Sequence, residues 1–316
     1  MLAVPDTTPE SEWLNVVADI RYDASSGTMF TMDRMAGTLA EVDTLGNLVH
    51  LYGRGRGAGP HEVRDWVDYS FSSSSVVFLD RGNRKVMVFP RLGSILDPFP
   101  VSTTYRSIAL AGDETILLAP GTGAHAVDIY SMAGDPVGGI GAFGELPVRC
   151  TPEEDCERTR RMCMGCVVRV VGDAVVVINR EMDLLTVYGA EGEPARSVDL
   201  RARIPLLREW IATDEPYLAR MQERANARSS GATVAVALKS YFSNAHTSPD
   251  ERLAFSINPA TPILQASGFQ YWLLDIETLE IESAMFSDPA HGMRATGWPT
   301  VFGVQRGSYA IYRLEG

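Results

Sequence analysis

The chain has 316 residues, of which 45% are hydrophobic and 22% are charged, and its formal net charge is −12. This composition is typical of a globular protein with a large buried core. The acidic balance argues against a nucleic-acid partner, whose phosphates would be repelled. No stretch has the roughly 20 apolar residues of a membrane-spanning helix. We therefore expect one domain over 1–316 with no transmembrane segment of its own.

Short apolar strands separated by turns begin near residue 16. The first group is predicted at 16–22, 28–32, 38–42 and 48–52, and the second runs from 66 to 96. A third group occupies 105–141, and a fourth occupies 166–200. The residues before the first group, 1–6, lack the basic start and apolar middle of a secretory signal, so the presence of a signal peptide or lipid anchor in a precursor stays open.

One hairpin pattern occurs in each of these four groups: an apolar strand end, a few turn residues, a glycine and a second strand. The glycines are Gly46, Gly93, Gly134 and Gly192, at steps of 47, 41 and 58 residues. Glycine supplies the positive φ of such a turn at little steric cost. A period of roughly 40 to 50 residues built from short strands is typical of β-propeller blades. The sequence predicts an all-β, six-bladed β-propeller.

A second repeated feature supports this register. Asp33, Asp80 and Asn179 each end the second strand of a predicted blade. Side chains of this kind accept hydrogen bonds from nearby backbone N–H groups and stop a strand. We expect them to form turns.

Two segments interrupt the strand pattern. The first insertion, 145–165, is rich in cysteine, and the second, 201–230, carries apolar residues among charges and predicts one or two helices. Thr213 and Asp214 are the predicted helix-start residues before Pro216. A fifth group of strands is predicted to begin at 233–238. The sixth holds two strands, at 298–304 and 308–312, before the chain ends.

All four cysteines fall within 17 residues, which indicates that they bind one another or a metal. They are Cys150, Cys156, Cys163 and Cys166. Two disulfides would restrict the unfolded ensemble of the insertion and would require an oxidising compartment. A four-thiolate zinc site is the alternative, because Cys163 and Cys166 have CxxC spacing. We favour disulfides, and both options stay open.

Two stretches of the chain resemble a known family. They are the glycine-rich link over 53–63 and the segment over 79–89, which contains Asp80, Asn83 and a strand ending in Phe89. They are similar to the six-bladed β-propellers related to NHL repeats, in which a glycine-rich link precedes an Asp-x-x-Asn segment. His61 stands where that family usually has glycine, and Val63 where it usually has an aromatic residue. The resemblance implies a propeller fold and an exported or lipid-anchored bacterial protein.

No pattern in the chain identifies a catalytic or cofactor-binding residue. The five histidines are scattered over different predicted blades, and each is expected to be a surface or packing residue. We therefore expect a non-catalytic, periplasmic or extracellular scaffold that binds another protein or a subunit of a membrane-associated complex. The expected partner-binding residues are Arg54, Arg56, Trp210 and Tyr217.

The alternative is an enzyme of the lyase or hydrolase type with its active site in the central channel. Charged side chains converging at one mouth of the channel would favour the enzyme. A channel filled by side chains that pack against one another would favour the scaffold. We expect no cofactor, although a structural cation is compatible with either hypothesis.

Overall fold

The computed structural model describes the chain from residue 17 to residue 314, with gaps. The described ranges are 17–33, 35–146, 166–180, 182–189, 192, 194–228, 242–248, 250–257, 269–286, 293–296, 301–305 and 311–314.

Five four-stranded antiparallel sheets, the blades, follow one another along the chain, with their strands in sequence order. Blade 1 is β1 (Val17–Asp23), β2 (Thr28–Asp33), β3 (Thr38–Asp43) and β4 (Leu48–Tyr52). Blade 2 is β5 (Trp66–Phe71), β6 (Ser75–Asp80), β7 (Lys85–Pro90) and β8 (Phe99–Pro100). Blade 3 is β9 (Tyr105–Ala111), β10 (Thr115–Pro120), β11 (His125–Ser131) and β12 (Pro136–Ala142), followed by the 3-10 helix η2 (Phe143–Glu145).

The remaining blades complete the chain. Blade 4 is β13 (Cys166–Val171), β14 (Ala174–Asn179), β15 (Leu184–Tyr188) and β16 (Pro194–Asp199). Two helices follow it, α2 (Leu200–Arg203) and α3 (Pro205–Arg228). Blade 5 is β17 (Phe242–Thr247), β18 (Leu253–Ile257), β19 (Phe269–Leu274) and β20 (Ile281–Phe286). A last sheet contains β21 (Met293–Thr296), β22 (Val301–Gln305) and β23 (Ile311–Leu314).

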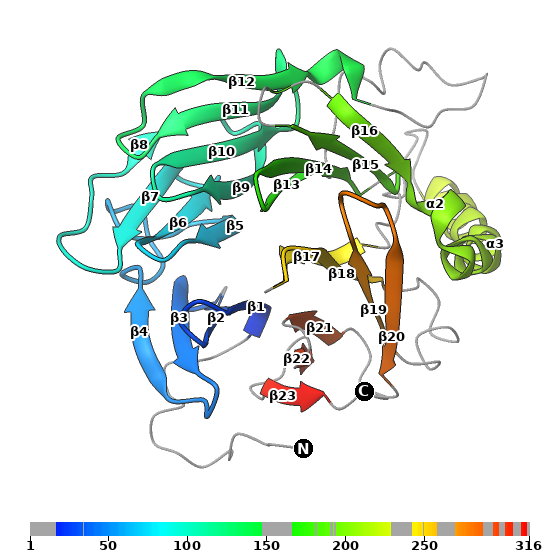
Figure 1. Cartoon of the computed structure of the whole chain (residues 1–316), viewed down its shortest axis with the longest axis horizontal. Coiled ribbons are helices and arrows are strands. Elements are labelled where there is room, and N and C mark those ends of the chain that lie inside the picture. Colours follow the sequence, from blue (N-terminus) through cyan, green and yellow to red (C-terminus); the bar gives the residue numbers. More distant parts are fainter. Residues whose placement is uncertain are drawn as a thin grey trace.

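The sheets stand around one central axis, so the chain is a β-propeller (Figure 1). The first strand of each blade lies nearest the axis, and the last sheet closes the ring because β21 contacts both β17 and β1. The turns after the first and third strands lie on one face, which we call the hairpin face. The turns after the second strands and the links between blades lie on the other, the link face.

The expected six blades are not confirmed. Among the described residues five blades have four strands, and the sixth sheet has three. The innermost strand of blade 5 is β17, a strand that the sequence did not predict, whereas the predicted strand 233–238 lies outside the described residues.

The apolar core lies between neighbouring blades rather than within a single sheet. Alternate residues of β6 point to opposite sides: Phe78 packs in the cluster shared with blade 1, and Val77 and Leu79 pack in the cluster shared with blade 3. Further clusters join blades 3 and 4 and blades 4 and 5. Because both faces of a middle strand are covered, such strands are nearly continuous runs of apolar residues.

The four repeated hairpins form as predicted. Gly46, Gly93, Gly134 and Gly192 all have positive φ, between +80° and +106°. The corresponding turn of blade 5 has no glycine, and Leu279 takes this backbone conformation instead, with φ +61°. Leu279 packs against the core between blades 4 and 5, and Asp275 accepts hydrogen bonds from the N–H groups of Glu277 and Thr278, both at 2.8 Å. Packing and side-chain capping therefore hold a turn that a leucine would otherwise disfavour.

The predicted turn role of Asp33 and Asp80 is confirmed. Asp33 accepts hydrogen bonds from the N–H groups of Met35 and Ala36, at 2.8 and 2.9 Å. Asp80 accepts from the N–H groups of its own turn and also from those of Arg64 and Asp65, at 3.1 and 2.9 Å. One buried carboxylate thus attaches the link between blades 1 and 2 to the second strand of blade 2.

The helical insertion follows blade 4, and its predicted start is wrong. Asp199 caps α2 by accepting from the N–H groups of Arg201 and Ala202, and α3 begins at Pro205. Thr213 lies inside α3, where its hydroxyl donates to the Glu209 carbonyl at 2.9 Å. Burial of Leu207, Trp210 and Ile211 against blades 4 and 5 favours an unbroken helix. This packing outweighs the hydrogen bond that Pro216 cannot donate inside the helix.

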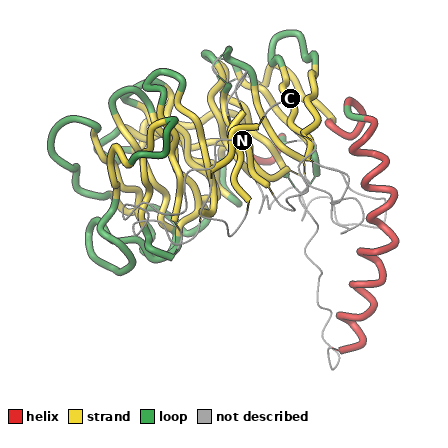
Figure 2. The backbone as a smooth tube through the Cα atoms, turned by 90° about the horizontal axis from the view of Figure 1, so that it is seen from below, coloured by secondary structure: helices red, strands yellow, loops and turns green. Residues whose placement is uncertain are grey.

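Figure 2 shows that α3 extends beyond the strands of the propeller. Its 24 residues correspond to about 36 Å of helix. Leu207, Trp210 and Ile211 of its first half pack in the core between blades 4 and 5, and Arg220 and Glu223 of its second half are exposed.

The hairpin glycines allow a matched test of packing. A Cβ at Gly134 would lie 2.3 Å from Cγ of the buried Phe99, whereas a Cβ at Gly93 would meet no atom within 4 Å. Both residues have positive φ, so Gly93→Ala should lower the free energy of unfolding by about 1 kcal/mol through backbone strain alone. Gly134→Ala should cost about 2–4 kcal/mol, since the Phe99 ring must also move. Urea unfolding of the two variants checks this, and equal losses would contradict it.

Candidate functional site

Charged and polar side chains of the innermost strands meet at the central axis. They are Asp19 and Arg21 of β1, Asp68 of β5, Ser107 of β9 and Arg169 of β13. Each is at most 8% exposed. We call these five residues the axial network.

The Asp68 carboxylate is the centre of the axial network. One oxygen accepts from Nη2 of Arg21 and from the Tyr69 N–H, the latter at 3.0 Å. The other accepts from Nη1 of Arg169 at 3.0 Å, from the Ile108 N–H at 3.2 Å and from the Ser107 hydroxyl. A single side chain of blade 2 is therefore bonded to blades 1, 3 and 4.

The two arginines extend these connections. Arg21 also pairs with Asp19 at 3.1 Å, donates to the Tyr69 carbonyl and lies 4.0 Å above the Tyr69 ring. Arg169 donates through Nε to the Ala245 carbonyl, so that the network reaches blade 5. The axial network therefore contains two buried guanidinium groups and two buried carboxylates, whose formal charges cancel.

The protonation states of Asp68 and of the neighbouring Tyr69 are fixed near neutral pH. Burial opposes ionisation of Asp68, but Arg169, Arg21 and the Ser107 hydrogen bond outweigh it, so the pKa of Asp68 lies well below its usual range. Burial and the field of Asp19 raise the pKa of Tyr69. Asp68 stays ionised and Tyr69 stays protonated near neutral pH, which leaves neither of them suited to exchange a proton.

His246 of β17 lies beside the axial network and is 5% exposed. Its Nε2 is 2.8 Å from the Tyr271 hydroxyl. Burial, together with the positive charges of Arg21 and Arg169, lowers the pKa of His246 to about 3. The imidazole is neutral at physiological pH and is a weak base.

A cavity of about 430 Å³ opens above the axial network on the hairpin face. Arg21, Arg169 and His246 form part of its lining, with the first-to-second turns of blades 2 and 3 at its rim. Ser74 of the blade 2 turn donates to Asp113 of the blade 3 turn at 2.7 Å. The cavity is thus polar at both its base and its rim.

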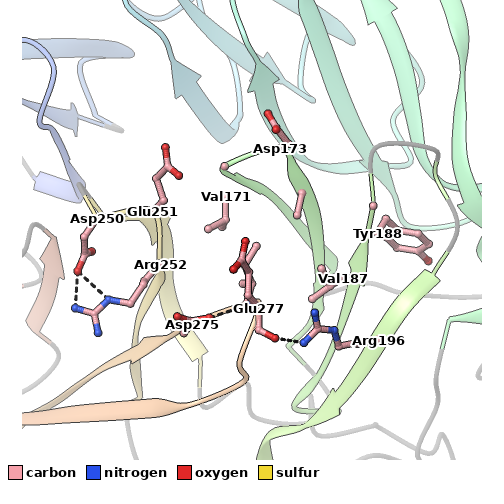
Figure 3. Close-up of a pocket in the computed structure, with 14 residues that line it drawn as sticks. Val171, Asp173, Val187, Tyr188, Arg196, Asp250, Glu251, Arg252, Asp275 and Glu277 are labelled. Carbon is pink, nitrogen blue, oxygen red and sulfur yellow. Dashed lines mark hydrogen bonds and ion pairs between the residues drawn. The ribbon is translucent and has the colours of Figure 1, made fainter.

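A larger pocket of about 730 Å³ lies between blades 4 and 5 on the same face (Figure 3). It shares Gly172 and Glu251 with the axial cavity, so the two hollows adjoin. Five carboxylates line it, and two arginines cross or border it. Arg196 donates to the Glu277 carbonyl, and Arg252 pairs with Asp250. The carboxylates are Asp173, Asp250, Glu251, Asp275 and Glu277.

No set of three or more His, Cys, Asp or Glu side chains among the described residues has the arrangement of a metal site. The expectation of no cofactor and the structural cation that the sequence left open both stay predictions. No described helix has the length and apolar character needed to cross a membrane.

The predicted partner-binding residues lie apart. Arg54 and Arg56 are exposed on the link between blades 1 and 2. Trp210 is 5% exposed and packs in the core beneath α3, so its contribution is to anchor the helix. Tyr217 belongs to the part of α3 beyond Asp214, and its side chain lies outside the described residues.

Three of the four cysteines also lie outside the described residues. Cys150, Cys156 and Cys163 fall in 147–165, and Cys166 begins β13 with 1% exposure. The choice between two disulfides and zinc stays a prediction.

Sequence reasoning missed the axial network, although a signal was present. Asp19 and Asp68 stand at equivalent positions of their blades. In the antiparallel pairing of the first and second strands, each lies opposite the residue that precedes the aspartate ending the second strand. Arg21 and Arg169 also occupy equivalent positions in blades 1 and 4. Each lies opposite the residue three positions before the last residue of the second strand. Charges at matched positions of first strands point to the axis of a propeller, since those strands are the innermost ones.

No protein-family model matches this chain, and no curated protein sequence matches it. Solved structures do match. A Bacteroides thetaiotaomicron protein of unknown function has a TM-score of 0.53 at 9% identity, with 95% of this chain and 70% of that chain covered. A putative exported protein of Bacteroides fragilis has a TM-score of 0.51 at 14% identity, with coverage of 88% and 73%.

A streptogramin B lyase structure also matches, with a TM-score of 0.51 at 10% identity and coverage of 99% and 96%. At these identities the similarity supports the β-propeller fold alone. The resemblance to NHL-related propellers is not confirmed.

Removing the charge of Asp68 should destabilise the fold strongly. In Asp68→Asn, two buried guanidinium groups lose their shared counter-ion, and the free energy of unfolding should fall by about 3–5 kcal/mol. Asp65→Asn is the matched control, because its ion pair with Arg81 at 2.8 Å is half exposed and should contribute at most about 1 kcal/mol. Chemical denaturation of both variants measures the difference, and similar losses would show that the axial network does not hold the blades together.

The buried neutral His246 should make the fold sensitive to acid. The unfolded chain binds a proton below about pH 6.5, whereas the folded chain resists protonation down to a pKa of about 3. The stability contribution is complete above pH 6.5 and is lost as the pH falls through this window, by about 1.4 kcal/mol per pH unit.

His246→Gln cannot take up this proton and should flatten the dependence of unfolding free energy on pH between about 6.5 and 4.5. His125→Gln, which removes an exposed histidine paired with Asp128, is the control and should keep the wild-type slope. A wild-type slope in His246→Gln would contradict the assignment.

Proposed function

We propose that this chain is a non-catalytic, extracytoplasmic β-propeller scaffold that binds another protein, such as a subunit of a membrane-associated complex. The observation that carries the proposal is the state of the axial network. Its charged side chains converge on the channel, as an enzyme would require, but they are bonded to one another and buried. A network whose charges are already balanced, and whose central Asp68 stays ionised near neutral pH, serves cohesion rather than acid–base chemistry.

The docking surface that we propose includes the helical insertion. The first half of α3 is fixed by Leu207, Trp210 and Ile211, and the second half extends beyond the strands (Figure 2). A helix that is anchored at one end and exposed at the other is preorganised for contact with a partner. The cysteine-rich insertion 145–165 is proposed as a second element of this surface, and segments that interrupt a rigid scaffold are common sites of binding.

The extracytoplasmic location rests on two kinds of support. Two disulfides among the four cysteines would require an oxidising compartment. The similar Bacteroides fragilis structure is described as a putative exported protein. Six blades related to NHL repeats are the arrangement that we propose for the complete ring.

A channel enzyme of the lyase or hydrolase type is the second candidate, because the axial cavity gives a small molecule access to Arg21, Arg169 and His246. Its weakness is that two buried titratable groups at the base of the cavity, His246 and Asp68, each keep one protonation state near neutral pH. His246 remains neutral, and Asp68 remains ionised with both oxygens occupied.

Site-specific photocrosslinking in the native host tests the scaffold. A photoreactive residue at exposed Glu223 of α3 should form a discrete adduct with one partner protein, because the end of the helix is proposed to dock there. The same residue at exposed Glu114, in the turn between β9 and β10, is the matched control and should form none. Absence of an adduct at Glu223, or equal labelling at both positions, would contradict the proposed docking element.

A further inference from the structure

A cluster of arginines on the link face is not explained by the fold. The link over 53–65 and the turn over 81–85 carry six arginine and lysine side chains against two carboxylates, in a chain whose net charge is −12. All five arginines of these two segments are exposed, and Arg81 is paired with Asp65. The other four are Arg54, Arg56, Arg64 and Arg84. We call these four residues the arginine patch.

The backbone beneath the patch is firmly held. Within the link, the Arg54 N–H donates to the His61 carbonyl at 2.9 Å, and the Val63 N–H donates to the Gly55 carbonyl at 2.9 Å. Asn83 of the blade 2 turn donates to the Gly57 carbonyl at 2.8 Å. The Lys85 ammonium, which is buried, donates to the Pro60 carbonyl at 2.8 Å. The segment 53–65 is therefore a fixed support rather than a free linker.

Glycines make room for the arginines on this support. A Cβ at Gly37, in the turn between β2 and β3, would lie 2.8 Å from Cγ of Arg56. A Cβ at Gly82, in the equivalent turn of blade 2, would lie 2.8 Å from Cβ of Arg64. The first part of each side chain is thus seated against a neighbouring turn, which reduces the entropy lost on binding.

The charges of the patch are not neutralised within the described part of the chain. None of its four guanidinium groups forms an ion pair with a described carboxylate. The two acids of the link are already engaged, since Glu62 accepts from the Gly59 N–H at 2.8 Å and Asp65 binds Arg81. Exposed arginines without counter-ions retain their capacity to bind an external anion.

We infer that the arginine patch is the docking site for a carboxylate-rich segment of the partner protein. This inference rests on the proposed scaffold function and adds the chemistry of the partner. The guanidinium group binds a carboxylate through two parallel hydrogen bonds, and all of the exposed cations in the patch are arginines. Charge complementarity on an otherwise acidic protein would also orient the partner toward this face before contact.

Other polyanions fit this surface less well. A long nucleic acid would extend beyond four arginines into the field of a chain with a net charge of −12. An anionic lipid surface would meet the same field, and stable attachment to a membrane requires apolar side chains that insert beside the cations. The exposed apolar residues of the link, Ala58 and Pro60, are small.

Binding of fluorescein-labelled octaglutamate, measured by anisotropy at about 50 mM salt, tests the inference. The wild-type chain should bind the peptide, with affinity that falls steeply as salt is added. Arg54→Glu with Arg84→Glu should weaken binding at least about tenfold, because two of the four guanidinium groups become repulsive. Arg203→Glu with Arg208→Glu, on the exposed surface of α2 and α3, is the matched control with the same change in net charge. It should change the affinity less than about threefold.

Circular dichroism and thermal unfolding establish that both double variants are folded. No binding by the wild type, or equal losses in the two variants, would overturn the inference. Binding to vesicles of phosphatidylglycerol and phosphatidylcholine without binding to octaglutamate would also overturn it in favour of a lipid surface. A photoadduct at Glu223 combined with no octaglutamate binding would reject the arginine patch and leave the scaffold proposal in place. The reverse result would reject the docking role of α3 alone.

Discussion

The arrangement of the blades depends on one carboxylate at the axis. Asp68 receives donors from blades 1, 3 and 4, and Arg169 extends the connection to blade 5. The apolar clusters act between adjacent blades only, so they hold neighbours together without fixing the blades across the ring. The hydrogen bonds at the axis fix the blades across the ring, which the apolar clusters do not do. A charged hydrogen bond is satisfied at one geometry and is costly when broken inside the protein.

This use of charge also makes Asp68 itself unsuited to catalysis. A catalytic group must change its charge or its partners during a reaction, and every such change at Asp68 would remove the counter-ion that two buried guanidinium groups share. The same reasoning applies to His246, whose neutrality is maintained by burial and by the two nearby arginines. The scaffold function that we propose uses the surface, where side chains can exchange water for a partner without disturbing the ring.

The repeat and the turn chemistry of the fold were readable from the sequence, because they are local. Gly46, Gly93 and Gly134 mark turns whose backbone requirement is independent of the rest of the chain. The axial network was missed because Asp68 and Arg169, 101 residues apart, meet only after the ring closes. The predicted start of α3 was wrong for a related reason. Pro216 is a local stop signal, and the packing of the preceding turns against blades 4 and 5, which overrides it, is not local.

The distribution of charge separates the two faces of the propeller. On the hairpin face, carboxylates line the pocket between blades 4 and 5, and Asp113 and Glu251 border the axial cavity. On the link face, the arginine patch stands on a rigid support near blades 1 and 2. The net charge of −12 is thus distributed unevenly over the described surface. An acidic partner would be repelled from the hairpin face and attracted to the link face, so the field of the whole protein reinforces the specificity of four side chains.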